Sequence, residues 1–118
     1  MDPKTIGQSG EDAAADFLRR RGYNIVERNC RLAGTEIDII AEKDRILCFI
    51  EVKTRKSEDF GSPEEFVTPK KIGKLIRGAK IFSARKKFRD FQVRFDVIAL
   101  VGSPGHYALT HIEDAFTE

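Results

Sequence analysis

The sequence has no apolar run that approaches the roughly 20 residues of a membrane-spanning helix. Residues 1–4 lack the basic stretch followed by an apolar stretch that is typical of a signal peptide. Only two cysteines are present, Cys30 and Cys48, and they lack the spacing of a metal-binding pair. We therefore expect a cytoplasmic protein that does not associate with a membrane and forms no disulfide.

Internal repeats and low-complexity tracts are also missing. A chain of 118 residues is long enough to bury one core. Its hydrophobic fraction of 41% is ordinary for a globular protein. The sequence therefore predicts a single domain over residues 1–118.

Acidic residues are absent between Val67 and Arg89. This stretch contains nine basic residues: Lys70, Lys71, Lys74, Arg77, Lys80, Arg85, Lys86, Lys87 and Arg89. A second basic cluster covers residues 19–21. Such clusters are typical of proteins that contact a phosphate backbone, although a solvated helix face has the same pattern. Taken as a whole, the run favours a polyanionic partner.

The spacing of apolar residues predicts helices and strands in alternating blocks. We expect helices over residues 10–21 and from 69 to about 88, with Thr68 as the N-cap of the second. Expected strands are 23–32, 35–41, 46–53, 92–101 and 106–112, with a loop over 54–66 and a turn over 113–116. This order predicts an α/β (α+β) fold with a central mixed sheet of about five strands flanked by helices. The second helix can bring the fourth strand parallel to the third.

Two apolar strands carry charged residues where a buried strand should have none. A turn centred on residues 44–45 places Asp38 opposite Glu51 and Glu36 opposite Lys53. Opposed residues have Cβ atoms roughly 4.5–5.5 Å apart, and like charges at that distance destabilise a sheet. A hard divalent cation reverses this penalty, because it binds carboxylate oxygens. The alternative is an ordinary hairpin with a solvated polar face and a Glu36–Lys53 ion pair.

An acid in the first helix, followed by a hairpin with Asp and Glu-x-Lys, resembles the PD-(D/E)XK nuclease superfamily at Glu11, Asp38, Glu51 and Lys53. More closely, the chain resembles the YraN-like (UPF0102-type) family of small bacterial proteins, which is related to archaeal Holliday-junction resolvases. The matching stretches are residues 10–14, 28–31, 36–40, 49–55, 60–63 and 94–99. Two positions depart from the pattern: Ile37 stands where the motif has proline, and Thr35 stands where glycine is expected.

The resemblance implies a restriction-endonuclease-like core and a bound Mg²⁺ or Mn²⁺. Its metal ligands would be Asp38, Glu51 and the Val52 carbonyl, with Glu11 approaching from the first helix. Lys53 would orient the attacking water or neutralise charge on the phosphate. Glu36 is a further candidate catalytic acid at the edge of the site. Glu11 has an alternative role as an acid placed favourably at a helix start.

The basic residues expected to contact nucleic acid are Arg55, Lys70, Lys71 and Lys74, although Lys71 could equally be a solvated lysine. The loop over 54–66 could close over a substrate. Asp96 is interpreted as a buried structural acid paired with Arg94 or a backbone group, and His106 and His111 as structural residues.

These features predict a metal-dependent endonuclease that hydrolyses DNA, including branched DNA, and DNA is favoured over RNA as the partner. A homodimer is an expectation drawn from the resolvase-like relatives. The alternatives are an inactive nucleic-acid-binding module on a nuclease scaffold and a protein–protein adaptor that uses the basic helix.

Overall fold

The computed structural model describes residues 3–56 and 68–116. Two α-helices, one short 3-10 helix and five strands make up this part of the chain. In chain order they are α1 (Pro3–Arg20), β1 (Asn24–Leu32), β2 (Thr35–Lys43), β3 (Ile46–Arg55), α2 (Pro69–Ser83), η2 (Lys86–Phe88), β4 (Gln92–Val101) and β5 (Ala108–Phe116).

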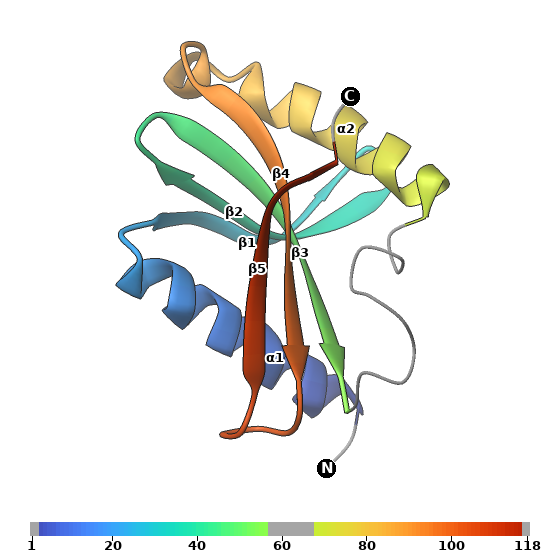
Figure 1. Cartoon of the computed structure of the whole chain (residues 1–118). Coiled ribbons are helices and arrows are strands. Elements are labelled where there is room, and N and C mark those ends of the chain that lie inside the picture. The colour runs from blue at the N-terminus through green and yellow to red at the C-terminus, as the bar shows by residue number, and fades with distance from the viewer. Residues whose placement is uncertain (1–2, 57–67, 117–118) are drawn as a thin grey trace.

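The strands form one sheet in the order β1-β2-β3-β4-β5 (Figure 1). Neighbouring strands run antiparallel except β3 and β4, which pair in parallel after the crossover through α2. The fold is therefore α+β with a mixed five-stranded sheet, as predicted, and it fits a restriction-endonuclease-like core. The strand that follows α2 has the parallel orientation expected from the sequence.

The helices lie on opposite faces of the sheet, and each covers its own apolar core (Figure 1). On the α2 side, Phe49 and Phe82 belong to a cluster with Ile37 and Leu47. On the α1 side, Leu18 packs with residues that include Ile39 and Ile50. Because β3 is covered on both faces, its run from Leu47 to Glu51 is fully buried.

Several element boundaries differ from the sequence prediction, most of them by one or two residues. Helix α1 begins at Pro3 instead of residue 10, because proline suits the first turn of a helix. Helix α2 ends at Ser83, and η2 forms the rest of the predicted segment. The turn predicted over residues 113–116 is wrong: β5 continues to Phe116, whose ring stacks on Phe95 at 5.2 Å between centroids.

The loop predicted over residues 54–66 is only partly described. Residues 54 and 55 belong to β3, and residues 57–67, which include most of the loop expected to close over a substrate, lie outside the described part of the chain. Neither described helix combines the length and the apolar character needed to cross a membrane.

Candidate metal and nucleic-acid site

The turn between β2 and β3 sets the register of the site. Asp44 and Arg45 both have positive φ, at 52° and 61°, as a two-residue hairpin turn of type I′ requires. The pairs from Lys43–Ile46 to Ile39–Ile50 follow the predicted register, in which Asp38 and Glu51 come next. The predicted approach of these two carboxylates therefore depends on a turn of the expected length.

The regular strand geometry of β2 is interrupted at Asp38. Ile37 packs in the core on the α2 side, whereas Ile39 packs on the α1 side, so the regular alternation of faces is broken between them. The β2–β3 pairing ends at Ile39–Ile50. In place of the next ladder bond, the Val52 N–H donates to Asp38 Oδ2 at 2.8 Å. The end of the ladder thus leaves a carboxylate, instead of a backbone carbonyl, beside β3.

Glu51 is the most deeply buried acid of this region, at 3% exposure. Its Oε1 accepts from Lys71 Nζ, and Lys53 Nζ lies 3.2 Å from the same oxygen. Its Oε2 is buried and has no hydrogen-bond partner among the described residues. A buried carboxylate oxygen without a partner is costly, and a bound cation is one way in which proteins satisfy it.

Burial and the nearby charge of Glu51 raise the pKa of Asp38 to about 7, although the Val52 N–H acts in the opposite direction. Burial alone would lower the pKa of Lys71, but its hydrogen bond to Glu51 and the charges of Glu51 and Asp38 raise it overall. The carboxylates of Asp38 and Glu51 therefore lie close enough that both interact with the positive charge of Lys71. A carboxylate with a raised pKa that lines a hollow, as Asp38 does, is characteristic of functional sites.

Glu11 reaches this region from the middle of α1. Its Oε1 accepts from Arg28 Nε and from Asn29 Nδ2, both at 3.1 Å. Close packing of α1 on β3 depends on Gly10, since a Cβ at this position would collide with Thr54 Oγ1. Glu11 is thus held by the first strand and is not, as the dipole alternative assumed, in the first turn of the helix.

An open hollow of about 320 Å³ lies where these elements meet. It is lined by Glu11, Asp38, Val52, Lys53, Thr54 and Arg55. Within residues 3–56 and 68–116, no three His, Cys, Asp or Glu side chains converge closely enough to hold one metal ion. The donors suited to a hard cation are therefore the carboxylates of Asp38 and Glu51, with backbone oxygen or water completing the set.

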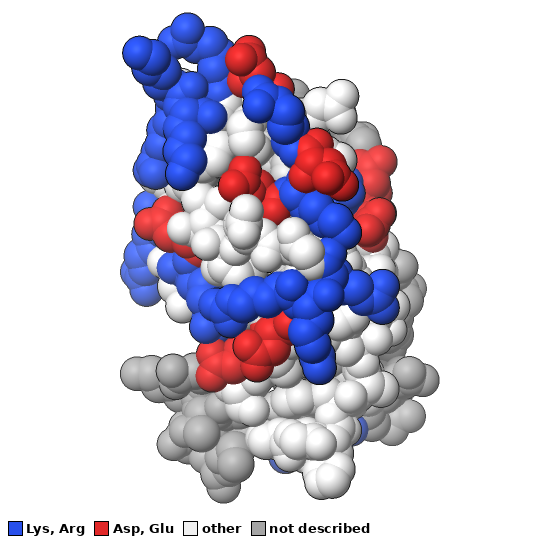
Figure 2. Space-filling view, turned by 90° about the vertical axis from the view of Figure 1, so that its left-hand side faces the viewer, with Lys and Arg blue, Asp and Glu red and all other residues white. Residues whose placement is uncertain are grey.

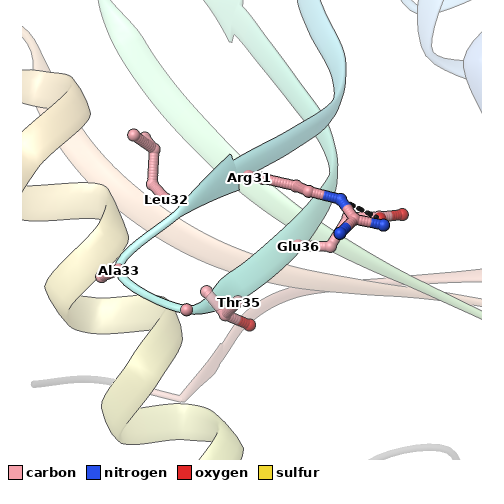
Figure 3. A pocket seen from close by; sticks show the side chains of 6 residues that line it. Arg31, Leu32, Ala33, Thr35 and Glu36 are labelled. Atoms are coloured by element: carbon pink, nitrogen blue, oxygen red, sulfur yellow. Dashed lines mark ion pairs between the residues drawn. The ribbon is translucent and has the colours of Figure 1, made fainter.

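Glu36 is separated from these residues. It pairs across the hairpin with Arg31 of β1, and Arg31 Nε lies 3.4 Å from Glu36 Oε2. Figure 3 shows both side chains together at a different hollow, of about 390 Å³, at the β1–β2 turn. The predicted facing of Glu36 and Lys53 is not formed, because β2 leaves β3 before reaching Glu36.

The predicted nucleic-acid contacts fall into three places. Lys71 is bound to Glu51 and is part of the acidic site. Arg55 lines the hollow beside Asp38. Lys70, which is exposed, and Lys74, which is half-buried, lie on α2. Whether any of them touches a phosphate remains a prediction.

Sequence reasoning gave no role to Arg28 and Asn29. Both hold Glu11, and Arg28 Nη2 also donates to Asp12 Oδ1 at 2.6 Å. Asn29 has a φ of 54° in the middle of β1, a conformation that asparagine tolerates better than most residues. An asparagine within an otherwise regular strand pattern was the signal that could have indicated this position.

A second buried acid, Asp96, lies on β4 at 0% exposure. Both of its oxygens accept from Arg94 at 2.9 Å, and His111 Nε2 and the Asp114 N–H lie at 2.8 and 3.0 Å. Burial acts to raise the pKa of Asp96, but the hydrogen bonds from His111, Arg94 and Asp114 outweigh it and lower the pKa. The structural interpretation of Asp96 and His111 agrees with these contacts.

Comparison with known proteins relates the chain to one family over most of its length. The family described as "Uncharacterised protein family UPF0102" matches residues 10–100. This range includes every acidic and basic residue placed at the site above.

Individual relatives match nearly end to end. A UPF0102 protein of Clostridium perfringens is 47% identical over 116 residues, which cover 96% of this chain and 94% of the relative. UPF0102 proteins of Flavobacterium psychrophilum and Prosthecochloris aestuarii are 43% and 45% identical and cover 94% and 97% of this chain, and 92% and 94% of their own lengths. The chain therefore belongs to the UPF0102 family.

Proposed function

We propose that this protein is a metal-dependent endonuclease that hydrolyses phosphodiester bonds in DNA. The observation that carries the proposal is the buried Glu51 Oε2, which lacks a partner beside a second carboxylate, Asp38, whose pKa is raised. An acid that served only to stabilise the fold would be expected to have all its oxygens satisfied.

The residues present fit a Mg²⁺ or Mn²⁺ ion held by Asp38, Glu51 and the Val52 carbonyl. Such an ion lowers the pKa of bound water and stabilises charge on a phosphate. Glu11 lines the same hollow as Asp38 and Val52, where it can accept a hydrogen bond from a water.

Lys53 and Lys71 supply positive charge beside Glu51. Both ammonium groups meet at Glu51 Oε1. When a phosphate enters the hollow, either ammonium can donate to its oxygens and stabilise the negative charge that grows as water adds to phosphorus.

The test is incubation of the protein with end-labelled duplex, single-stranded and four-way-junction DNA in Mg²⁺ or Mn²⁺, with products separated on a denaturing gel. We expect wild-type cleavage of at least one substrate, and a loss of about 100-fold or more for Asp38→Asn and for Glu51→Gln. Glu36→Gln removes an acid of the same strand at a separate hollow, and it should cleave like the wild type. Equal inactivity of the wild type and Asp38→Asn on all substrates would contradict the proposal.

A second candidate is a nucleic-acid-binding module without catalytic activity. It is favoured by the absence, among the described residues, of a third metal-ligating side chain and by the two lysines that already neutralise Glu51. Calorimetry separates the two candidates, since this one predicts salt-dependent DNA binding with no heat of Mn²⁺ binding.

A further inference from the structure

Basic residues from three separate parts of the chain gather at one end of the molecule. We call this surface the basic end, and define it by nine exposed residues: Arg19, Arg20, Arg21, Lys43, Arg45, Arg85, Lys86, Lys87 and Arg89. They come from the end of α1, the β2–β3 turn, and the segment around η2. None of them was assigned to the candidate site.

Contacts between the three segments make the surface continuous. Lys43 of the hairpin donates to the backbone oxygen of Arg21 at 2.5 Å, which joins the turn to the end of α1. On its other side, the Gln92 N–H donates to the Arg45 oxygen at 3.0 Å, which joins the turn to the segment after η2. Tertiary packing therefore unites clusters that are far apart in the sequence.

Aromatic rings hold several of these cations in place. Arg21 lies over Phe17 at 4.9 Å, Arg45 over Phe91 at 5.0 Å, and Arg85 over Phe82 at 4.1 Å. Lys43 over Tyr23 and Lys87 over Phe88 repeat the arrangement at 5.3 and 5.6 Å. Stacking of this kind fixes long side chains before a ligand arrives, so that less conformational entropy is lost on binding.

Cations outnumber acids at this surface. The acids in and around it are Asp16, Glu42, Asp44, Asp90 and Glu113. Two of these engage surface cations, Asp16 with Arg19 at 3.2 Å and Asp90 with Arg45 at 3.8 Å. Figure 2 looks onto the side that holds these three segments and shows Lys and Arg side chains in a broad band, with smaller acidic groups between them.

The basic end and the acidic site lie at different positions along β3. Ile46 marks the end of the strand at the basic end, and Glu51 lies five residues further on. At roughly 3.3 Å per residue the two are about 17 Å apart. This separation corresponds to about five base pairs of a duplex at 3.4 Å per step.

We infer that the basic end is a second binding surface for the phosphate backbone of a nucleic acid, separate from the acidic site. It contacts phosphates some five or more base pairs away from the bond at Asp38 and Glu51. This inference depends on the proposed function only for the choice of nucleic acid as the ligand.

The fixed cations favour a nucleic acid over an anionic lipid surface. Phosphates of a duplex lie at constant spacing and match side chains that are held in position by ring stacking. Peripheral membrane binding commonly adds apolar residues that insert among the lipids. The basic end is defined by charged side chains, and its rings lie beneath the cations.

The test compares two variants that lose the same charge. Arg20→Gln/Lys86→Gln removes one exposed cation from each side of the basic end, and Arg31→Gln/Lys56→Gln removes two exposed cations that lie outside it and outside the basic run of residues 67–89. Binding to a 24-base-pair duplex is measured by fluorescence anisotropy in EDTA over a range of salt concentrations. We expect the first variant to flatten the slope of log affinity against log salt by up to about 1.8 units, and the second to leave it unchanged.

Equal slopes for the wild type and the basic-end variant would overturn the inference. So would a loss of binding to phosphatidylserine vesicles in the basic-end variant while duplex binding is retained. Because the assay excludes metal, its result is independent of cleavage. If the slope changed but the wild type cleaved no substrate, the inference about the basic end would stand and the proposed endonuclease activity would be rejected. If the wild type cleaved DNA but the slope did not change, the endonuclease proposal would stand and the inference about the basic end would be rejected.

Discussion

Two groups of buried carboxylates, one around Asp96 and one around Asp38 and Glu51, differ in how completely they are satisfied. Asp96 accepts hydrogen bonds from Arg94, His111 and a backbone N–H, and its pKa is lowered. Glu51 leaves Oε2 without a partner among the described residues, and Asp38 has a pKa raised to about 7. Burial alone therefore does not distinguish the two groups; the completeness of their hydrogen bonding does.

The largest expected effect is on stability at Asp96. Asp96→Asn removes the charge that pairs with Arg94, which is 18% exposed, and we expect a loss of about 3–5 kcal/mol in the free energy of unfolding. Glu51→Gln should cost less than this, because Glu51 Oε2 has no hydrogen-bond partner among the described residues and Lys71, at 34% exposure, can turn to water. Urea denaturation at pH 7 measures both.

The comparison would fail if the two substitutions destabilised the fold equally.

The pH dependence of stability gives a further check on Asp96. Because its folded pKa lies below the unfolded value, its contribution is present above the unfolded pKa and is lost as the pH falls through the folded pKa. Asp96→Asn should therefore lose less stability on acidification than the wild type.

The opposite sign is expected at Asp38. Its folded pKa of about 7 lies above the unfolded value, so ionisation opposes folding as the pH rises from about 4 to 7. Through this ionisation, the free energy of unfolding of the wild type should fall by about 2 kcal/mol between pH 5 and pH 8. The free energy of unfolding of Asp38→Asn should not show this fall. Denaturation at the two pH values checks this, with Glu36→Gln as the matched control on the same strand.

Metal binding should depend on the same ionisation. A cation requires the deprotonated carboxylate, so Mn²⁺ should raise the unfolding temperature more at pH 8 than at pH 6. Asp38→Asn should remove this stabilisation, whereas Asp96→Asn should retain it in the fraction that folds. If Mn²⁺ raised the unfolding temperature equally at both pH values, metal binding would not depend on the ionisation of Asp38.

The smallest effect concerns the position of Glu11. Gly10→Ala places a Cβ against Thr54 Oγ1 and should lower the free energy of unfolding despite the better helix propensity of alanine. In a Thr54→Ala background the collision is gone, and Gly10→Ala should then stabilise the fold by up to about 1 kcal/mol. A double-mutant cycle by thermal unfolding measures the difference. If both backgrounds responded alike, the close approach of α1 to β3 would not be what places Glu11.

Much of the fold could be predicted from the sequence because local signals were strong. The turn at residues 44–45 and the apolar strands around it fixed the β2–β3 register. Thr68 and Pro69 fixed the start of α2, where Lys71 N–H donates to Thr68 Oγ1 at 3.2 Å. Such signals act within a few residues, and so they can be read without knowledge of the rest of the chain.

The sequence by itself determined which strands and main helices form, and the register of the β2–β3 hairpin from Lys43–Ile46 to Ile39–Ile50. Only the tertiary structure decided that β2 leaves β3 at Asp38, that Glu36 goes to Arg31, and that Lys71 reaches Glu51 from α2. It also decided that three distant basic segments share one end of the molecule. The physical reason is that these contacts depend on how the sheet bends and how the helices pack on it, and this geometry is set by the whole core.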